Sequence, residues 1–370
     1  MSFRDLNIPA SSSTVTVTVF DIITDHAQVK APASVILKPV LPGYESLKCP
    51  MFAFLVENNV TKTRVMFDLG PRKDLENAAP PVAEVAKAAI PVSKDIVEQL
   101  VESGVDIESI NAVIWRHVSI NRFPQKLDMV EHPTPGDMSK FPPSTHLVIS
   151  KDLATETNDV NPQSTLLASD FTGHRLITLD FSDSSVEIGG LKAIDYFGDG
   201  SFYILDVPGH QAGHVCALAR VAPTNFVLMG ADACHHVGEL RPTSQLHARF
   251  PCPGALAAAT RVSVSYTHFP TSGPSPVFDL AARTTPLLSI PDGGVTDDLA
   301  TAHESLRKLA DFDANADVFI VIAHDESLLP VIGLFPASLD DWHAKGWKEA
   351  ATWAFLDEKN PAFRFNVKSS

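Results

Sequence analysis

Four residues with metal-binding side chains each follow a short apolar stretch of the kind that forms a β-strand. They are His117, His210, Asp232 and His324. Imidazole nitrogens and carboxylate oxygens suit Zn²⁺, and also iron or manganese, and a catalytic zinc needs about three protein ligands with one position left open for water. A single histidine after a strand is more often an ordinary polar residue than a ligand. The prediction of a metal site therefore depends on all four residues meeting in one cleft.

The stretches that would position these residues alternate between strand-like and helix-like patterns. Runs of β-branched and apolar residues predict strands over 13–20, 51–56, 63–69, 112–115, 146–150, 226–230 and 318–322, with further strands between 175 and 207. Apolar residues at helical spacing predict helices over 81–104, with a break at Pro91, over 297–309 and around 347–355. This order is expected of a layered α/β domain that presents ligands on loops at strand ends.

The composition of the chain narrows its partners. With 370 residues and 45% hydrophobic content, the chain is long enough for the single globular domain, residues 1–370, that we predict. Its net charge of -15 argues against a nucleic-acid or anionic-membrane partner, because clustered lysine and arginine would be needed there. The sequence shows no secretion signal, no run of roughly 18 apolar residues that would span a membrane, and no C-x-x-C pair. We expect a cytoplasmic protein that acts on a small molecule.

Several short motifs follow one another in an order that is specific for one superfamily. They are Phe67-Asp68-Leu69-Gly70 with Arg72-Lys73-Asp74, Trp115-Arg116-His117, Gly136-Asp137 with Phe141-Pro142-Pro143-Ser144-Thr145, Pro208-Gly209-His210-x-x-Gly213-His214, Gly230-Ala231-Asp232 with His235-His236, Arg241-Pro242, and Ala323-His324-Asp325. In this order they resemble the metallo-β-lactamase superfamily, in particular its lactonase-like and fungal lactamase-like branches. The resemblance covers most of the chain.

The resemblance implies a fold and a set of ligands. Members of the superfamily are four-layer αββα sandwiches with a binuclear zinc site between the two sheets. By matching position, His117 and His210 would bind the first metal. Asp232 would bridge the two metals, and His324 would bind the second.

Four other polar residues lie close to these motifs. His214, His235 and His236 match superfamily positions that are not ligands, so we expect them to pack or to form hydrogen bonds near the site. Asp68 stands at the end of the predicted strand over 63–69, directly before a turn. It either supports a ligand from behind or caps the turn.

The chain departs from the superfamily in the ligand loop that should follow His117, where the superfamily pattern is His-x-His-x-Asp-His. Aligned forward from His117, the other three ligand positions hold Ser119, Asn121 and Arg122. Aligned backward from Gly136-Asp137, the same positions hold Glu131, Pro133 and Thr134. Either alignment loses at least three ligands.

An extra segment, residues 123–135, lies where the superfamily has a single residue. Three explanations are open. The segment is an insertion in which Glu131 or His132 replaces a lost ligand, or a lid over a remodelled pocket, or a sequence artefact such as a retained intron that has displaced the true ligand loop.

The loss affects the two metals differently. The first metal keeps His117, His210 and Asp232, a set that can hold a single ion with open positions. The second keeps only Asp232 and His324. The guanidinium of Arg122 in that place would repel a cation and could itself pair with Asp232. We therefore expect one zinc ion rather than two.

Two functions are open for such a site. The first is a hydrolase in which metal-activated water opens a small lactone, lactam or related ester, with Asp232 orienting the water and Arg122 stabilising the oxyanion in place of the second metal. The alternative is a remodelled or inactive metal-free member of the fold, such as a lyase, a cyclase or a binding module. In that case Ser119, Asn121 and Arg122 would form a polar pocket floor suited to anions. The metal content of the protein distinguishes the two.

Overall fold

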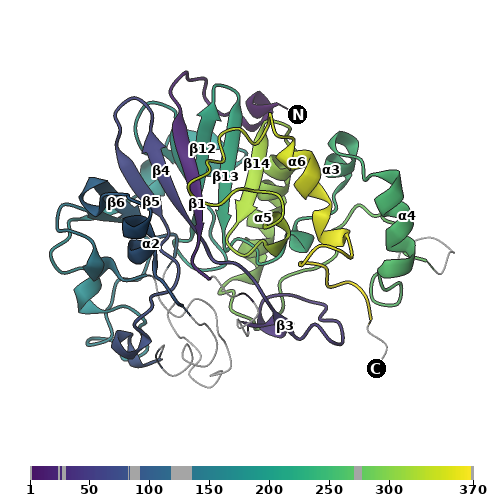
Figure 1. The fold of residues 1–370 in the computed structure, drawn as a ribbon, viewed down its shortest axis with the longest axis horizontal. Coiled ribbons are helices and arrows are strands. Elements are labelled where there is room, and N and C mark those ends of the chain that lie inside the picture. Colours follow the sequence, from purple (N-terminus) through teal and green to yellow (C-terminus); the bar gives the residue numbers. More distant parts are fainter. Residues whose placement is uncertain are drawn as a thin grey trace.

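The structure is a computed structural model that describes residues 2–23, 26, 31–81, 83, 92–117, 136–270 and 277–367. These residues form two six-stranded β-sheets, a two-stranded ribbon and several helices (Figure 1). The ribbon pairs β2 (Ala31–Pro32) with β3 (Ser46–Leu47). Within the described part of the chain, no helix is both long and apolar enough to cross a membrane.

The first sheet contains strands from the N-terminal half of the chain. In sheet order they are β1 (Val15–Asp21), β4 (Phe52–Asn58), β5 (Arg64–Phe67), β6 (Ile110–Ile114), β7 (His146–Ser150) and β8 (Leu176–Leu179). The pairings of β1 with β4 and of β4 with β5 are antiparallel, whereas β5 to β8 run parallel. The carboxyl ends of β5 and β6 therefore meet at one edge, where the chain continues into Asp68 and towards His117.

The second sheet contains the later strands. In sheet order they are β14 (Val318–Ile322), β13 (Asn225–Ala231), β12 (Val215–Ala222), β11 (Phe202–Asp206), β10 (Leu191–Asp195) and β9 (Val186–Ile188). All neighbours are antiparallel except β13 and β14, which are parallel. Because β13 and β14 end at the same edge, Asp232 and His324, which follow them closely, are brought together.

The position of the core follows from the alternation of side chains along the strands of the first sheet. Val19 of β1 and Phe54 of β4 belong to the core between the two sheets. Their neighbours Phe20 and Leu55 belong to a second core on the outer face of the first sheet. A sheet that is buried on both faces needs continuous apolar strands, which explains the unbroken apolar run at 51–56.

In the described part of the chain, helices lie on the outer face of each sheet. The helix α2 (Ile96–Glu102) packs on the first sheet, and α5 (Leu299–Asp313) packs on the second (Figure 1). Each begins at an aspartate whose carboxylate accepts a backbone N–H from the first turn, Asp95 in α2 and Asp298 in α5. The buried residues of α5 recur at helical spacing and include Ala302, Leu306 and Leu309. The predicted αββα sandwich is therefore confirmed.

Several elements differ from the sequence-based expectation in extent. The strands over 146–150 and 318–322 agree with the structure residue for residue. Of the helix expected over 81–104, the structure describes α2 near the C-terminal end, and residues 82 and 84–91 lie outside the described part. The helices α3 (Ser244–Arg249) and α4 (Gly254–Ser263) give no clear sequence signal, because both are short and are separated by prolines. The last predicted helix ends early, as α6 (Trp347–Thr352).

A buried ion pair joins α5 to the end of α6. The Nε and Nη2 atoms of Arg241 each donate to a carboxylate oxygen of Asp313 at 2.8 Å. The Nη1 atom donates to the carbonyl oxygen of Thr352 at 3.0 Å. Because both charged side chains are buried and the contact is bidentate, the pair fixes the C-terminal end of α5 against the end of α6.

Removing one partner of this pair should destabilise the protein strongly. In Asp313→Ala the guanidinium of Arg241 stays buried without its carboxylate, and we expect the free energy of unfolding to fall by about 3 to 5 kcal/mol. Urea denaturation followed by tryptophan fluorescence measures the change. The control Glu304→Ala removes an exposed partner of Arg307 on the same helix and should leave the stability nearly unchanged. Equal losses in the two variants would contradict the role given to the buried pair.

Candidate metal centre

Asp232 lies at the centre of the site, directly after β13, and its side chain is fully buried. The preceding Ala231 has a φ of 49°, a left-handed conformation that is strained for a residue with a Cβ and turns the chain sharply. The backbone N–H of Asp232 donates to Nε2 of His214 at 3.2 Å. Because Nε2 accepts, Nδ1 of His214 carries the proton and donates to the carbonyl oxygen of Val207 at 2.8 Å. His214 is thus occupied in holding the loop, as expected for a residue that is not a ligand.

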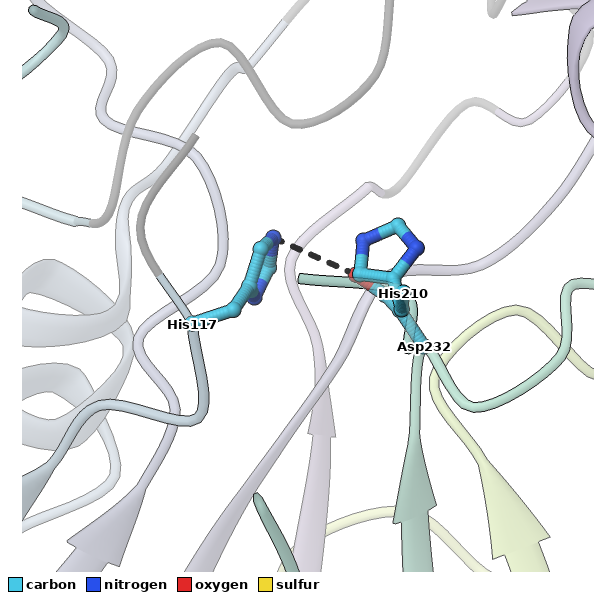
Figure 2. A group of neighbouring side chains, drawn as sticks. All are labelled: His117, His210 and Asp232. Atoms are coloured by element: carbon cyan, nitrogen blue, oxygen red, sulfur yellow. Dashed lines mark ion pairs between the residues drawn. The ribbon is translucent and has the colours of Figure 1, made fainter. Parts of the chain in front are cut away.

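His117 and His210 face the same oxygen of Asp232. The Nε2 atoms of His117 and His210 lie 3.4 Å and 3.9 Å from Oδ2 of Asp232. Figure 2 shows His117 facing the Asp232 carboxylate across the end of the strands, with His210 beside it. The ligand atoms of these three buried residues all lie within 4.8 Å of one another. The separations of 3.4 Å and 3.9 Å are those of donors that can share one ion at about 2.0 to 2.2 Å from each.

The loop that carries His210 is pressed against α5. Gly209 has a φ of 126°, and a Cβ at this position would lie 2.2 Å from the backbone nitrogen of Ala302. The N–H groups of Asp297 and Asp298 donate to the carbonyl oxygens of His210 and Gly209, both at 2.9 Å. Only glycine fits here, and the start of α5 therefore fixes the position of His210.

His324 approaches the other oxygen of Asp232. Its Nε2 lies 3.1 Å from Oδ1 of Asp232, and its Nδ1 lies 2.9 Å from the carbonyl oxygen of Pro50. The ligand atoms of Asp232, His324 and His235 also lie within 4.8 Å of one another. The expectation that His235 only packs near the site is therefore incomplete, because the structure places it among the possible ligands.

The two neighbouring histidines take different directions because a short 3-10 helix, Val237–Glu239, follows them. The backbone N–H of His235 donates to Oε2 of Glu239 at 2.8 Å. Nδ1 of His236 accepts the N–H of Gly238 at 2.9 Å and so caps this helix. His236 is thus a structural residue, as expected, whereas its neighbour faces Asp232.

The donor groups fit a metal ion. Nδ1 of His210 is buried and has no hydrogen-bond partner among the residues that the structure describes. Burial lowers the pKa of His210 well below its usual range, which keeps the ring in the neutral form that binds metals. Burial also lowers the pKa of His324, but the hydrogen bond and charge of Asp232 outweigh it and hold that pKa well above its usual range. A metal ion at Asp232 would replace this proton.

The structure also shows a buried cation that the sequence reasoning missed. Nη1 of Arg116 pairs with Oδ2 of Asp232, and Nε of Arg116 pairs with Oδ2 of Asp68. Burial lowers the pKa of Arg116, but the charges of Asp232 and Asp68 outweigh it and raise that pKa. Asp68 is held in turn by the N–H groups of Leu69 and Gly70. Asp68 therefore supports Asp232 through Arg116. The signal for Arg116 in the sequence was weak, since it is a charged residue that directly follows the apolar run 112–115.

The remaining predicted site residue, Arg122, lies outside the described residues. The same holds for Ser119, Asn121 and the segment 123–135. The roles expected of these residues stay predictions. Among the described residues, it is Arg116 that forms the pairing with Asp232 expected of Arg122.

Known proteins match this chain over nearly its whole length. No family model matches it. The metallo-hydrolase mfmC of Annulohypoxylon moriforme is 36% identical over 375 residues, which cover 96% of this chain and 90% of mfmC. The gamma-lactamase FDB1 of Fusarium pseudograminearum is 32% identical over 380 residues, which cover 96% of this chain and 84% of FDB1. The chain belongs to the fungal lactamase-like branch of the metallo-β-lactamase superfamily.

Solved structures agree with the superfamily fold. An N-acyl homoserine lactone hydrolase with N-hexanoyl-L-homoserine bound at its catalytic metal centre superposes with a TM-score of 0.50, over 88% of this chain and 99% of that one. The identity is 11%, so the likeness concerns the fold alone. The chain spans only 38% of two other curated relatives, the cytochrome P450 monooxygenases mpaDE and mpaDE' of Penicillium brevicompactum.

The buried Arg116 of this member of the metallo-β-lactamase superfamily should stabilise the metal-free protein and compete with a metal. In Arg116→Gln, Asp68 and Asp232 lose their shared cation, and we expect the free energy of unfolding without metal to fall by about 3 to 5 kcal/mol. The affinity for zinc should rise, because the guanidinium no longer occupies Oδ2 of Asp232. Urea denaturation and calorimetric zinc titration measure the two effects. The control is Arg64→Gln, which removes a guanidinium paired with Glu57 at the opposite end of β5 from Asp68. It should leave the zinc affinity unchanged. An unchanged zinc affinity in Arg116→Gln would argue against the competition.

Two buried histidines should make the protein sensitive to acid. Burial lowers the pKa of His214 and of His236 to about 4, below the ordinary value of 6.5. Between these two values the unfolded chain binds more protons than the folded one, so stability is complete above pH 6.5 and falls as the pH approaches 4. Each histidine contributes a slope of about 1.4 kcal/mol per pH unit in this window. Urea denaturation across the window should show a smaller slope for His236→Gln. An identical slope would contradict the prediction.

Proposed function

We propose that this chain is a metal-dependent hydrolase that opens a small lactone or lactam ring or cleaves a related ester. The observation that carries the proposal is the convergence of His117 and His210 on one oxygen of the buried Asp232. Two imidazoles and one carboxylate can hold one zinc ion and leave positions for water and substrate. Zinc is proposed because this set of ligands suits it, and the Nε2 atoms of His117 and His210 both face the same buried carboxylate oxygen.

An ion held by these residues supplies a Lewis acid for the carbonyl oxygen and for the attacking water. The protein's own groups place the reactants. Asp232 accepts a hydrogen bond from the attacking water and orients it towards the carbonyl carbon. Arg116 is only 2% exposed, so it does not reach a substrate. It acts as a positioning residue that keeps Asp232 ionised and fixed. Arg122 stays the proposed donor to the oxyanion that attack on the carbonyl produces.

The choice of substrate class is supported by the relatives. A gamma-lactamase and a metallo-hydrolase share more than 30% identity with nearly all of this chain. A cyclic amide or ester of low molecular weight fits both names and the strongly acidic chain, which favours neutral or cationic substrates. These relatives give no support to a metal-free lyase, cyclase or binding module. A cytoplasmic location stays a prediction.

Substitution of His210 should separate this function from the metal-free alternative. We expect His210→Ala to lose one equivalent of zinc and about a hundredfold or more of its turnover. The first cluster, which consists of His117, His210 and Asp232, then keeps only two ligands. Elemental analysis of dialysed protein measures the metal, and chromatography of a panel of γ-lactams and lactones measures turnover.

The matched control is His303→Ala, which removes an exposed imidazole on the adjacent α5 and should change neither quantity. Full activity of His210→Ala would reject the proposed site. A wild-type protein that holds less than about a tenth of an equivalent of zinc, iron or manganese would favour the metal-free alternative.

A further inference from the structure

We propose that His235 is a metal ligand that forms, with Asp232 and His324, a second divalent-cation site on the Oδ1 side of the Asp232 carboxylate. The superfamily pattern leaves this chain only Asp232 and His324 for a second ion. The structure adds a third donor, because the ligand atoms of all three buried residues lie within 4.8 Å of one another. Two imidazoles and one carboxylate suit zinc or a similar divalent cation. We call Asp232, His235 and His324 the second cluster. The proposal rests on the proposed function only in that Asp232 belongs to both clusters.

His324 already has the orientation of a metal-binding histidine. Such a residue usually donates one ring nitrogen to a carbonyl or carboxylate oxygen and presents the other to the metal. Nδ1 of His324 lies 2.9 Å from the carbonyl oxygen of Pro50. Its Nε2 is thereby directed at Oδ1 of Asp232, 3.1 Å away.

The ring of His235 stacks on that of His324. The two rings are nearly parallel, with an interplanar angle of 9° and centroids 5.7 Å apart. The ring centroid of His210 lies 5.3 Å from that of His235. The backbone of His235 is fixed by the hydrogen bond from its N–H to Glu239. The ring therefore has its position before any ion binds, which lowers the entropic penalty of binding.

The two oxygens of Asp232 differ in their charged neighbours. Arg116 pairs with Oδ2, the oxygen that His117 and His210 also face. Its positive charge therefore opposes a metal ion in the first cluster more directly than one on the Oδ1 side. A cation at His235 and His324 would bind Oδ1 of Asp232, whereas Arg116 pairs with Oδ2.

A small pocket adjoins the second cluster. Its wall includes His235, His324 and Cys49. The acidic Asp325 and Glu326 also line it, as do the cationic Lys48 and Arg364. The second cluster therefore borders a pocket of its own, whose lining does not include His117 or His210.

Cobalt titration of the full chain tests the proposal. The protein is freed of metal with a chelator, and Co²⁺ is added while its d–d absorption is followed, since this absorption reports both the number and the geometry of bound ions. We expect His235→Gln to bind one equivalent fewer than the wild type. The control is His303→Gln, which removes an exposed imidazole on α5, and it should bind as many ions as the wild type. An unchanged stoichiometry in His235→Gln would overturn the proposal.

A second measurement does not require the His235 variant to fold. His210→Gln disables the first cluster and should still bind one Co²⁺. X-ray absorption spectroscopy of this ion should show two imidazole ligands, and a single imidazole would overturn the proposal. Failure of the proposed function has a different signature. Suppose that metal-loaded wild-type protein hydrolyses no lactam or lactone, but His235→Gln still binds one equivalent of cobalt fewer. This result would reject the hydrolase and support the second site.

Discussion

The burial of one negative charge is the constraint on which the site depends. Asp232 is fully buried at the end of β13, and an uncompensated carboxylate in such a place would be unfavourable by several kcal/mol. The compensation comes from both halves of the sandwich. Arg116 follows β6 in the first sheet, and His324 follows β14 in the second. The same carboxylate thus ties the two sheets together at one edge, and a bound metal would replace part of this compensation.

The direction of the strands explains why distant segments meet at this edge. The parallel pairs β5–β6 and β13–β14 each deliver the following residues to the same end of their sheet. His210 arrives differently, on the connection between the antiparallel strands β11 and β12. Its loop needs an additional support, which the start of α5 supplies through hydrogen bonds to Gly209 and His210.

The sequence was sufficient to predict the residues whose placement depends on strand ends alone. His117, Asp232 and His324 follow apolar strands directly or closely, and the strands themselves have a clear local pattern. The roles of His235 and Arg116 depend on the direction of a side chain, which the sequence does not show. His235 faces the site because a capped 3-10 helix turns its neighbour away. Arg116 pairs inward with two carboxylates that lie far apart in the sequence. The single domain over 1–370 stays a prediction.

The contact between Gly209 and the backbone of Ala302 has a consequence for how this site can evolve. Because no atom can be added between the loop and the helix, any shift of α5 along the sheet is passed on to His210. Part of this helix faces solvent, where substitutions usually change the stability of a protein little. Substitutions on the exposed side of α5 can therefore change the position of the buried His210 imidazole. Natural variation can alter the geometry of the metal centre in this way without replacing any of its residues.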